Sequence, residues 1–187
     1  MHIKTIDLRT ITEADARASA ELVCSIWPKP GRTVESLTAD LLTRWKDYHG
    51  PESQCPRSFF IREDDQLIAH ASAVPRTIGT QSVDMTVLAL ARVCTHPLAR
   101  GRYLGEAMAR AALGLVDDGT FPFALFQTNE AVRPFYERLG ALAVHNQFIN
   151  SSAENPQASA FWDTVIMRYP ATPGWPAGEI DLRGPGW

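Results

Sequence analysis

Residues 93–113, VCTHPLARGRYLGEAMARAAL, are the stretch that decides the fold of this chain. An apolar segment that includes residues 87–91, VLALA, leads into this stretch. Its continuous hydrophobic character predicts a strand covered on both faces. A loop containing Gly101 and Gly105 comes next, and apolar residues then return at helical spacing. This order leaves the first backbone N–H groups of the helix without partners, beside the positive end of the helix dipole. The stretch therefore favours binding of a phosphate or pyrophosphate.

The loop resembles the acyl-CoA pyrophosphate loop of the GNAT superfamily of N-acetyltransferases, whose motif reads Arg/Gln-x-x-Gly-x-Gly/Ala. Arg100 and Gly105 match the motif, and Arg102 adds positive charge. Tyr103 replaces the middle glycine, so its amide can still donate to a phosphate but a side chain is added. Without a second motif, a plain connection between strand and helix is an equally good interpretation. The resemblance implies that acetyl-CoA is the co-substrate. The loop residues expected to bind it are Arg100, Gly101, Arg102, Tyr103, Leu104 and Gly105.

A second motif follows a short apolar strand at residues 123–127, FALFQ. Residues 129–141, NEAVRPFYERLGA, resemble the second GNAT motif, Asn-x-x-Ala-x-x-Phe-Tyr-x-x-x-Gly-Phe. Val132 and Ala141 stand where that motif has its alanine and its final phenylalanine. In the family, the fourth and fifth strands splay apart and the pantetheine arm of acetyl-CoA lies in the gap. Two motifs in this order make the resemblance more specific than either motif alone.

The resemblance implies roles for individual residues. Asn129 hydrogen-bonds the pantetheine arm, and Tyr136 is the general acid that protonates the departing thiolate. The alternative for Tyr136 is an aromatic ring packed under the cofactor. Backbone N–H groups near the end of the fourth strand, at Val93, Cys94 and Thr95, polarise the thioester oxygen. For the side chain of Cys94, a small buried core residue is the favoured interpretation.

The base that removes a proton from the amine is not assigned by the sequence. Many family members use a glutamate on the fourth strand, but residues 85–95 here contain Arg92 as their only charged residue. The candidates are His70, Asp84 and a chain of water molecules. For His70, a position that faces solvent or a neighbouring strand is favoured over catalysis.

Two regions are candidates for binding the acceptor. In the resembling family the first two helices lie over one edge of the active-site cleft, so Trp27, Trp45 and Tyr48 are candidates for shaping an acceptor pocket. Aromatic residues at helical spacing more often belong to the core, and that interpretation is favoured. His70 is a further candidate for contact with the acceptor.

The second region is the C-terminal segment, residues 170–187, which is rich in proline, glycine and tryptophan and is expected to pack on the domain. Its sequence GEIDLRGPGW resembles the C-terminal region of aminoglycoside 2′-N-acetyltransferases. That resemblance implies that Glu179, Asp181 and the Trp187 carboxylate bind a cationic amine. Solvated acidic groups are the favoured alternative.

The whole pattern predicts an α/β fold of the α+β kind, with a mixed, mostly antiparallel central sheet flanked by helices and with splayed fourth and fifth strands. Thr12 and Thr33 are expected to cap two helices, the first ending before Pro28 and the second continuing to Gly50. Pro75 predicts a bulge, bend or edge in its strand. Strands are expected around residues 6–8, 59–61, 67–71, 85–94, 123–127, 142–148 and 161–169.

Composition narrows the class of protein. A length of 187 residues favours one domain over residues 1–187. The net charge of −3 predicts no nucleic-acid or membrane partner. Neither a membrane span nor a signal peptide is recognised, so a cytoplasmic location is expected. Cys24, Cys55 and Cys94 have neither disulfide-framework nor metal-site spacing, and no metal is expected.

The leading hypothesis is an N-acetyltransferase that transfers an acetyl group from acetyl-CoA to a primary amine of a small molecule, by direct attack in a ternary complex. One alternative is a non-catalytic acyl-CoA-binding sensor or scaffold module, and another is an N-acyltransferase for longer chains. The missing middle glycine and the missing strand glutamate keep the sensor open. Asn129 together with Tyr136 favours the enzyme. The sequence leaves the acceptor and the formation of a homodimer open.

Overall fold

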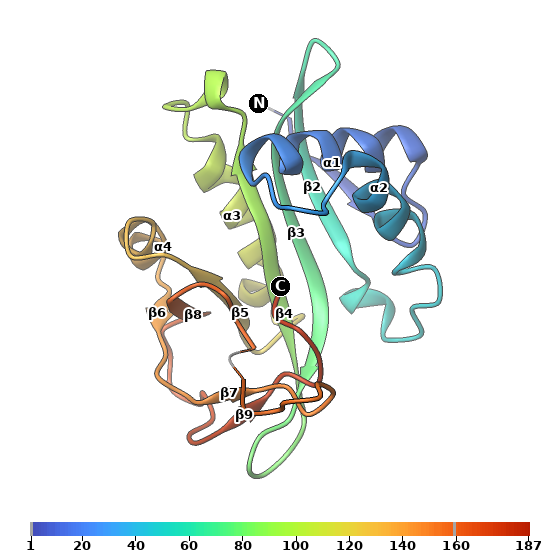
Figure 1. Cartoon of the computed structure of the whole chain (residues 1–187). Helices are drawn as coiled ribbons and strands as arrows, with labels where there is room; N and C mark the ends of the chain where they lie inside the picture. The colour runs from blue at the N-terminus through green and yellow to red at the C-terminus, as the bar shows by residue number, and fades with distance from the viewer. Residues whose placement is uncertain (1, 159) are drawn as a thin grey trace. The chain divides into compact units, whose positions relative to one another are not determined.

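The structure is a computed structural model that describes residues 2–158 and 160–187 (Figure 1). Its elements follow the predicted order of a strand, two helices, three strands, a helix, a strand and a helix. The helices are α1 (Glu13–Ile26), α2 (Val34–Thr43), α3 (Leu104–Asp117) and α4 (Arg133–Arg138), with short 3-10 turns at Glu52–Gln54 and Pro97–Ala99. The strands are β1 (Lys4–Asp7), β2 (Arg57–Glu63), β3 (Gln66–Ile78), β4 (Met85–Thr95), β5 (Ala124–Thr128), β6 (Leu142–Ala143), β7 (Phe148–Ile149), β8 (Val165–Tyr169) and β9 (Ile180–Asp181).

Within the described residues, seven strands form one sheet in the hydrogen-bonded order β1-β2-β3-β4-β5-β8-β6, and β7 pairs with β9 in a second sheet. The pairs β1–β2, β2–β3, β5–β8 and β6–β8 are antiparallel. β4 and β5 are parallel, with Leu88 opposite Ala124 and Ala89 opposite Leu125. The predicted α/β fold with a mixed, mostly antiparallel sheet is therefore confirmed.

The chain divides into two compact units. The first unit comprises Met1–Val74 and Ala91–Ala112, and the second comprises Pro75–Leu90 and Leu113–Trp187. The strands β3 and β4 and the helix α3 each contribute residues to both units. A single domain over residues 1–187 stays a prediction.

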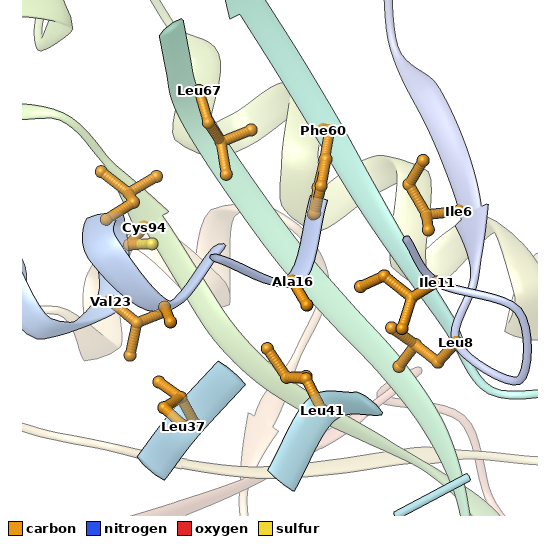
Figure 2. Close-up of a cluster of buried hydrophobic side chains, with 12 residues drawn as sticks. Ile6, Leu8, Ile11, Ala16, Val23, Leu37, Leu41, Phe60, Leu67 and Cys94 are labelled. Atoms are coloured by element: carbon orange, nitrogen blue, oxygen red, sulfur yellow. The ribbon is translucent and has the colours of Figure 1, made fainter. Parts of the chain in front are cut away.

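The core of the first unit gathers side chains from α1, α2 and strands β1 to β4. Figure 2 shows Ala16 and Val23 of α1 with Leu37 and Leu41 of α2, and all four are buried. Both helices begin as predicted, because Thr12 accepts a hydrogen bond from the Asp15 backbone and Thr33 forms a reciprocal capping box with Ser36.

The expected continuation of α2 to Gly50 is wrong. The helix ends at Thr43, and the next hydrogen bonds, from Lys46 N to Thr43 O and from Tyr48 N to Trp45 O, join residues three apart. Such bonds close turns and do not extend an α-helix. The Tyr48 hydroxyl then donates to the carbonyl groups of Pro51 and Gln54 at 3.2 Å, which holds the chain in the following loop.

In the second unit, the expected continuous strand over residues 142–148 is wrong. Only its two ends are strands, and between them Asn146 uses its side chain to bind the C-terminal segment. Asn146 Nδ2 donates to the carbonyls of Pro176 and Gly178, and its Oδ1 accepts from Trp175 Nε1 at 2.7 Å. These contacts between distant residues end the strand, and local alternation cannot reveal them.

The end of the C-terminal segment contacts β5 in the same unit. Trp187 Nε1 donates to the Leu125 carbonyl at 3.0 Å, and Gln127 Nε2 donates to the Trp187 main-chain oxygen at 2.6 Å. The Arg76 guanidinium lies over the Trp187 ring, with its Cζ 5.4 Å from the ring centroid. Packing of residues 170–187 on a single domain stays a prediction.

Candidate functional site

The loop between β4 and α3 has the backbone geometry of an anion site. Gly101 and Tyr103 adopt positive φ angles of 78° and 58°. The first bond into the helix runs from Ala107 N to Tyr103 O, at 3.1 Å. Across the part of the chain that the structure describes, the backbone N–H groups from Gly101 to Glu106 donate to no protein acceptor. Consecutive N–H groups of this kind at a helix start favour a bound anion.

The two arginines of the loop differ in their surroundings. Arg102 forms a bidentate ion pair with Glu63, with distances of 3.0 and 2.7 Å, and both side chains are about half-exposed. Arg100 is exposed and has no ion pair or hydrogen bond from its guanidinium among the described residues. The positive charge of the loop that remains unneutralised is therefore that of Arg100.

Tyr103 carries backbone strain because it is not a glycine. The left-handed conformation costs an L-residue about 1–2 kcal/mol, whereas glycine adopts it freely. The Tyr103 side chain is 81% exposed, so its removal forfeits little packing. The positive φ explains why glycine suits this position.

Tyr103→Gly is expected to raise the free energy of unfolding by up to about 1 kcal/mol, since relief of strain exceeds the added entropy of the unfolded chain. Urea denaturation measures this change. Tyr103→Ala is the control, because it removes the ring but keeps the Cβ and the strain. Equal stability of the glycine and alanine variants would show that the strain is absent.

The end of β4 contributes a side chain to the core as well as backbone to the loop. Cys94 is buried in the core of the first unit, next to Val23 (Figure 2). Burial raises the pKa of the Cys94 thiol to about 12, against a weaker opposing effect of Arg92. Thr95 lies against the start of α3, with its Oγ1 3.6 Å from the position of a Cβ on Gly105. The core interpretation of Cys94 describes its side chain, and a role for the backbone of Val93 to Thr95 stays a prediction.

His70 is fully buried, so solvent exposure is excluded for this residue. Its Nε2 lies 3.1 Å from the hydroxyl groups of Ser58 and Ser72, and its Nδ1 lies 3.4 Å from that of Ser19. Burial, with a smaller effect of the Arg92 charge, lowers the pKa of His70 to about 3. A neutral imidazole with this pKa and three serine neighbours serves packing, and neither acceptor contact nor base catalysis gains support from it.

The free energy of unfolding is expected to fall as the pH drops below 6.5. The unfolded chain protonates His70 near its ordinary pKa of 6.5, whereas the folded chain does so only near 3. Between these values the unfolded state binds more protons, and at pH 5 the loss relative to pH 7.5 is about 2 kcal/mol. Urea denaturation at the two pH values measures it. His70→Gln, which keeps hydrogen-bonding capacity without titrating, should lack this decrease, and an equal decrease in both proteins contradicts the prediction.

In the second unit, Asn129 directly follows β5 and starts the turn into α4. Its Oδ1 and its main-chain oxygen both accept from Val132 N at 3.1 Å, and the main-chain oxygen also accepts from Arg133 N. Its Nδ2 makes no hydrogen bond within the described residues, so this donor is open to a ligand. Tyr136 is buried, with its ring 4.5 Å from that of Phe126 and 4.8 Å from that of Phe135. These contacts orient the ring under either interpretation of Tyr136.

The remaining candidates, for the base or for binding of the amine, are acidic residues of the second unit. Asp84 is bound by both terminal nitrogens of Arg183, at 2.5 and 2.7 Å. Asp181 Oδ1 accepts hydrogen bonds from the backbone N–H groups of Ser151 and Arg183. Burial raises the pKa of Asp181, but these hydrogen bonds outweigh burial, so the pKa lies below its usual value. Glu179 is exposed. Binding of an amine by Glu179, Asp181 or Trp187 stays a prediction.

The aromatic candidates of the first unit lie in different surroundings. Trp45 packs against the core, in agreement with the favoured interpretation. Trp27 follows α1 directly and is exposed. A role for Trp27 in binding an acceptor stays a prediction.

Sequence patterns do not identify a hollow lined by α2 and Arg92 in the first unit. Its cationic residues are separated along the chain, and the acidic net charge of −3 conceals them. A partial signal is the pair of basic residues Lys29 and Arg32 in the turn after α1.

Asp7, Glu52 and Cys55 bring three potential metal ligands within 4.8 Å of one another. Arg9 donates to both carboxylates, at 2.5 Å from Asp7 Oδ2 and 2.6 Å from Glu52 Oε2. A guanidinium in this position already neutralises the acidic groups. The geometry therefore gives no reason to add a metal.

A family model described as an acetyltransferase (GNAT) domain matches residues 7–143. Since the match covers most of the chain, the protein belongs to the GNAT acetyltransferase family. The domain supports an acyl-CoA-dependent N-acyltransferase in general, with acetyl-CoA or another acyl-CoA as co-substrate. Comparison with curated proteins finds no match.

Solved structures support the fold. The chain is similar to a GCN5-related N-acetyltransferase from Kribbella flavida, with 17% identity and a TM-score of 0.57 over 76% of this chain and 34% of that one. It thus spans about a third of that protein. An acyl-CoA N-acyltransferase from Pseudomonas aeruginosa has 15% identity and a TM-score of 0.55, covering 89% and 97%. Glucosamine-6-phosphate N-acetyltransferase from Arabidopsis thaliana has 15% identity and a TM-score of 0.58, covering 87% and 100%.

Among the residues described, none of the helices has the length and apolar character needed to cross a bilayer.

Proposed function

We propose that this protein transfers an acetyl group from acetyl-CoA to a primary amine of a small molecule, by direct attack within a ternary complex. The observation that carries the proposal is the run of N–H groups from Gly101 to Glu106, at the start of α3, which donate to no acceptor among the described residues. These groups, with Arg100, supply the donors and the charge that a diphosphate requires. The open Nδ2 of Asn129 supports the binding of a pantetheine amide.

The reaction needs few protein groups. The neutral amine attacks the thioester carbonyl carbon, and the oxyanion that forms accepts hydrogen bonds from backbone N–H groups between Val93 and Thr95. The C–S bond then breaks, and the thiolate takes a proton from the Tyr136 hydroxyl. The nitrogen gives its extra proton to water, the Tyr136 phenolate takes a proton back from solvent, and the products are the amide and free CoA.

The burial of His70 and the ion pair of Asp84 leave water as the favoured carrier of the amine proton. A chain of water molecules can take this proton to solvent without a dedicated base. Such a route requires the acceptor to bind as the neutral amine, which is a minor species for an ordinary lysine-like amine with a pKa of ~10.4.

The proposal is tested by binding of acetyl-CoA, measured by calorimetry, and by release of CoA on addition of amines, measured with a thiol reagent. Amino acids, amino sugars, polyamines and peptide N-termini form the panel. Binding and acceptor-dependent release are expected. Binding without release for any amine favours the sensor module, and absence of binding contradicts the proposal. Turnover of long-chain acyl-CoA in preference to acetyl-CoA indicates the longer-chain acyltransferase.

A further inference from the structure

The hollow in the first unit has a volume of about 410 Å³ and is lined by the loop after α1, by α2 with the residue that follows it, and by β4. Four of its nine lining residues are cationic, namely Lys29, Arg32, Arg44 and Arg92, and one, Asp40, is anionic. The whole chain has the opposite balance, with 18 basic and 21 acidic side chains. The hollow is therefore a local concentration of positive charge on an acidic protein.

The single carboxylate does not neutralise the hollow. Asp40 Oδ1 accepts from Arg44 at 2.9 and 2.6 Å, and Oδ2 lies 3.9 Å from Arg92 Nη2. Arg32 has no ion pair or hydrogen bond from its guanidinium within the described part of the chain. Like charges held together with too few acids repel one another, and a bound anion relieves that repulsion.

Arg92 is constrained in a way that points to a role. It lies within β4 with a φ of 55°, a conformation rare for residues other than glycine. Its side chain is only 25% exposed, and burial lowers its pKa, with Arg44 and Arg32 acting in the same direction against Asp40. The charge is thus partly removed from water, and its ion pair with Asp40 is long, at 3.9 Å from Arg92 Nη2 to Asp40 Oδ2.

The position of Arg92 connects the hollow with the chemistry. The next residue, Val93, begins the backbone segment to which the proposed function assigns the thioester oxygen. The arginine that lines the hollow and the backbone proposed to bind the thioester oxygen are therefore consecutive along β4.

We propose that the acceptor amine also carries a carboxylate or phosphate, and that Arg32 and Arg92 hold this anionic group in the hollow. The inference rests on the proposed function and adds the class of its acceptor. Guanidinium groups bind carboxylate and phosphate by the same paired hydrogen bonds. Polycationic acceptors, such as aminoglycosides, are repelled by the same charges.

The test uses pairs of amines that differ only in the anionic group. L-alanine is compared with L-alaninamide, and glucosamine 6-phosphate with glucosamine, while spermidine represents the polycations. Release of CoA is measured at saturating acetyl-CoA. In one pair the anionic member is expected to have a kcat/KM about 30-fold or more above that of its neutral partner, and the pair that responds identifies the anion. Equal or better turnover of neutral or cationic amines overturns the inference but leaves the proposed function.

Substitutions of the two arginines test whether the hollow binds the anionic group of the acceptor. Arg32→Gln and Arg92→Gln are each expected to raise the KM of the anionic acceptor about tenfold or more, with an unchanged Kd for acetyl-CoA. Arg17→Gln is the matched control, since Arg17 pairs with Glu21 and Glu35 and does not line the hollow. An unchanged KM in both hollow variants contradicts the inference.

A titration decides the case in which no amine of the panel reacts. Inorganic phosphate is added to the protein saturated with CoA, and binding is followed by phosphorus NMR. Binding that Arg92→Gln weakens supports the inference, and equal binding by both proteins, or none, overturns it. Failure to bind acetyl-CoA, by contrast, overturns the proposed function itself.

Discussion

Gly105→Glu is expected to abolish measurable binding of CoA while leaving the protein folded. The new carboxylate would lie at the start of α3, against the diphosphate, where like charges cost several kcal/mol and lower the affinity about 100-fold or more. The backbone accepts the substitution, because a Cβ at Gly105 meets only Thr95 Oγ1, at 3.6 Å. Calorimetry with CoA measures the loss.

The fold of this variant is expected to be more stable than that of the parent. An acidic residue in the first turn of a helix contributes about 0.3–1 kcal/mol, and glycine is a poor helix former. Gly105→Gln separates charge from size. Gly114→Glu repeats the change later in α3, where a Cβ meets none of the described atoms outside the surrounding helix backbone within 4 Å, and should retain affinity. Unchanged affinity in Gly105→Glu would refute the phosphate loop.

Tyr136→Phe is expected to lower kcat about 100-fold, with little change in the Kd of acetyl-CoA. The ring contacts with Phe126 and Phe135 persist in phenylalanine, so the variant removes the hydroxyl and keeps the packing. Loss of a general acid typically costs about 10²–10⁴-fold in rate, and a thiolate, being a good leaving group, places the effect at the lower end.

Tyr169→Phe is the matched control for this experiment. The Tyr169 hydroxyl donates to Asp117 Oδ1 at 2.6 Å and has no assigned part in the reaction. Its variant should keep the parental kcat. If Tyr136→Phe also keeps the parental kcat, Tyr136 is an aromatic packed under the cofactor and not the acid.

The features that the sequence predicts well are local ones. A threonine before each of the first two helices bonds to the backbone of a residue three positions later, and this short-range signal places Thr12 and Thr33 correctly. The strand and loop before α3 are likewise visible as a continuous apolar run followed by glycines. By contrast, the break after Ala143 depends on distant partners, such as the contacts of Asn146 with Pro176.

The same distinction divides the candidate site. The positive φ at Gly101 follows from a tight loop, and the glycine in the sequence indicates this conformation. The ion pair of Arg102 with Glu63 cannot be predicted from local sequence, because the two residues lie 39 positions apart and only the folded β2–β3 hairpin brings the carboxylate to the loop. Arg92 is visible in the sequence as an isolated charge on an apolar strand, but the arginine that joins it, Arg32, lies 60 positions earlier.

The burial of the cysteines determines how clearly release of CoA can be followed with a thiol reagent. Cys55 and Cys94 are both buried, and the pKa of Cys94 is raised to about 12, so a colourless disulfide reagent meets little thiolate on the native chain. Cys24 is partly buried, and its reaction with the reagent is expected to set the background absorbance, which is the blank. Absorbance that grows after this blank therefore counts released CoA, and a sudden rise on heating would report unfolding in the same cuvette.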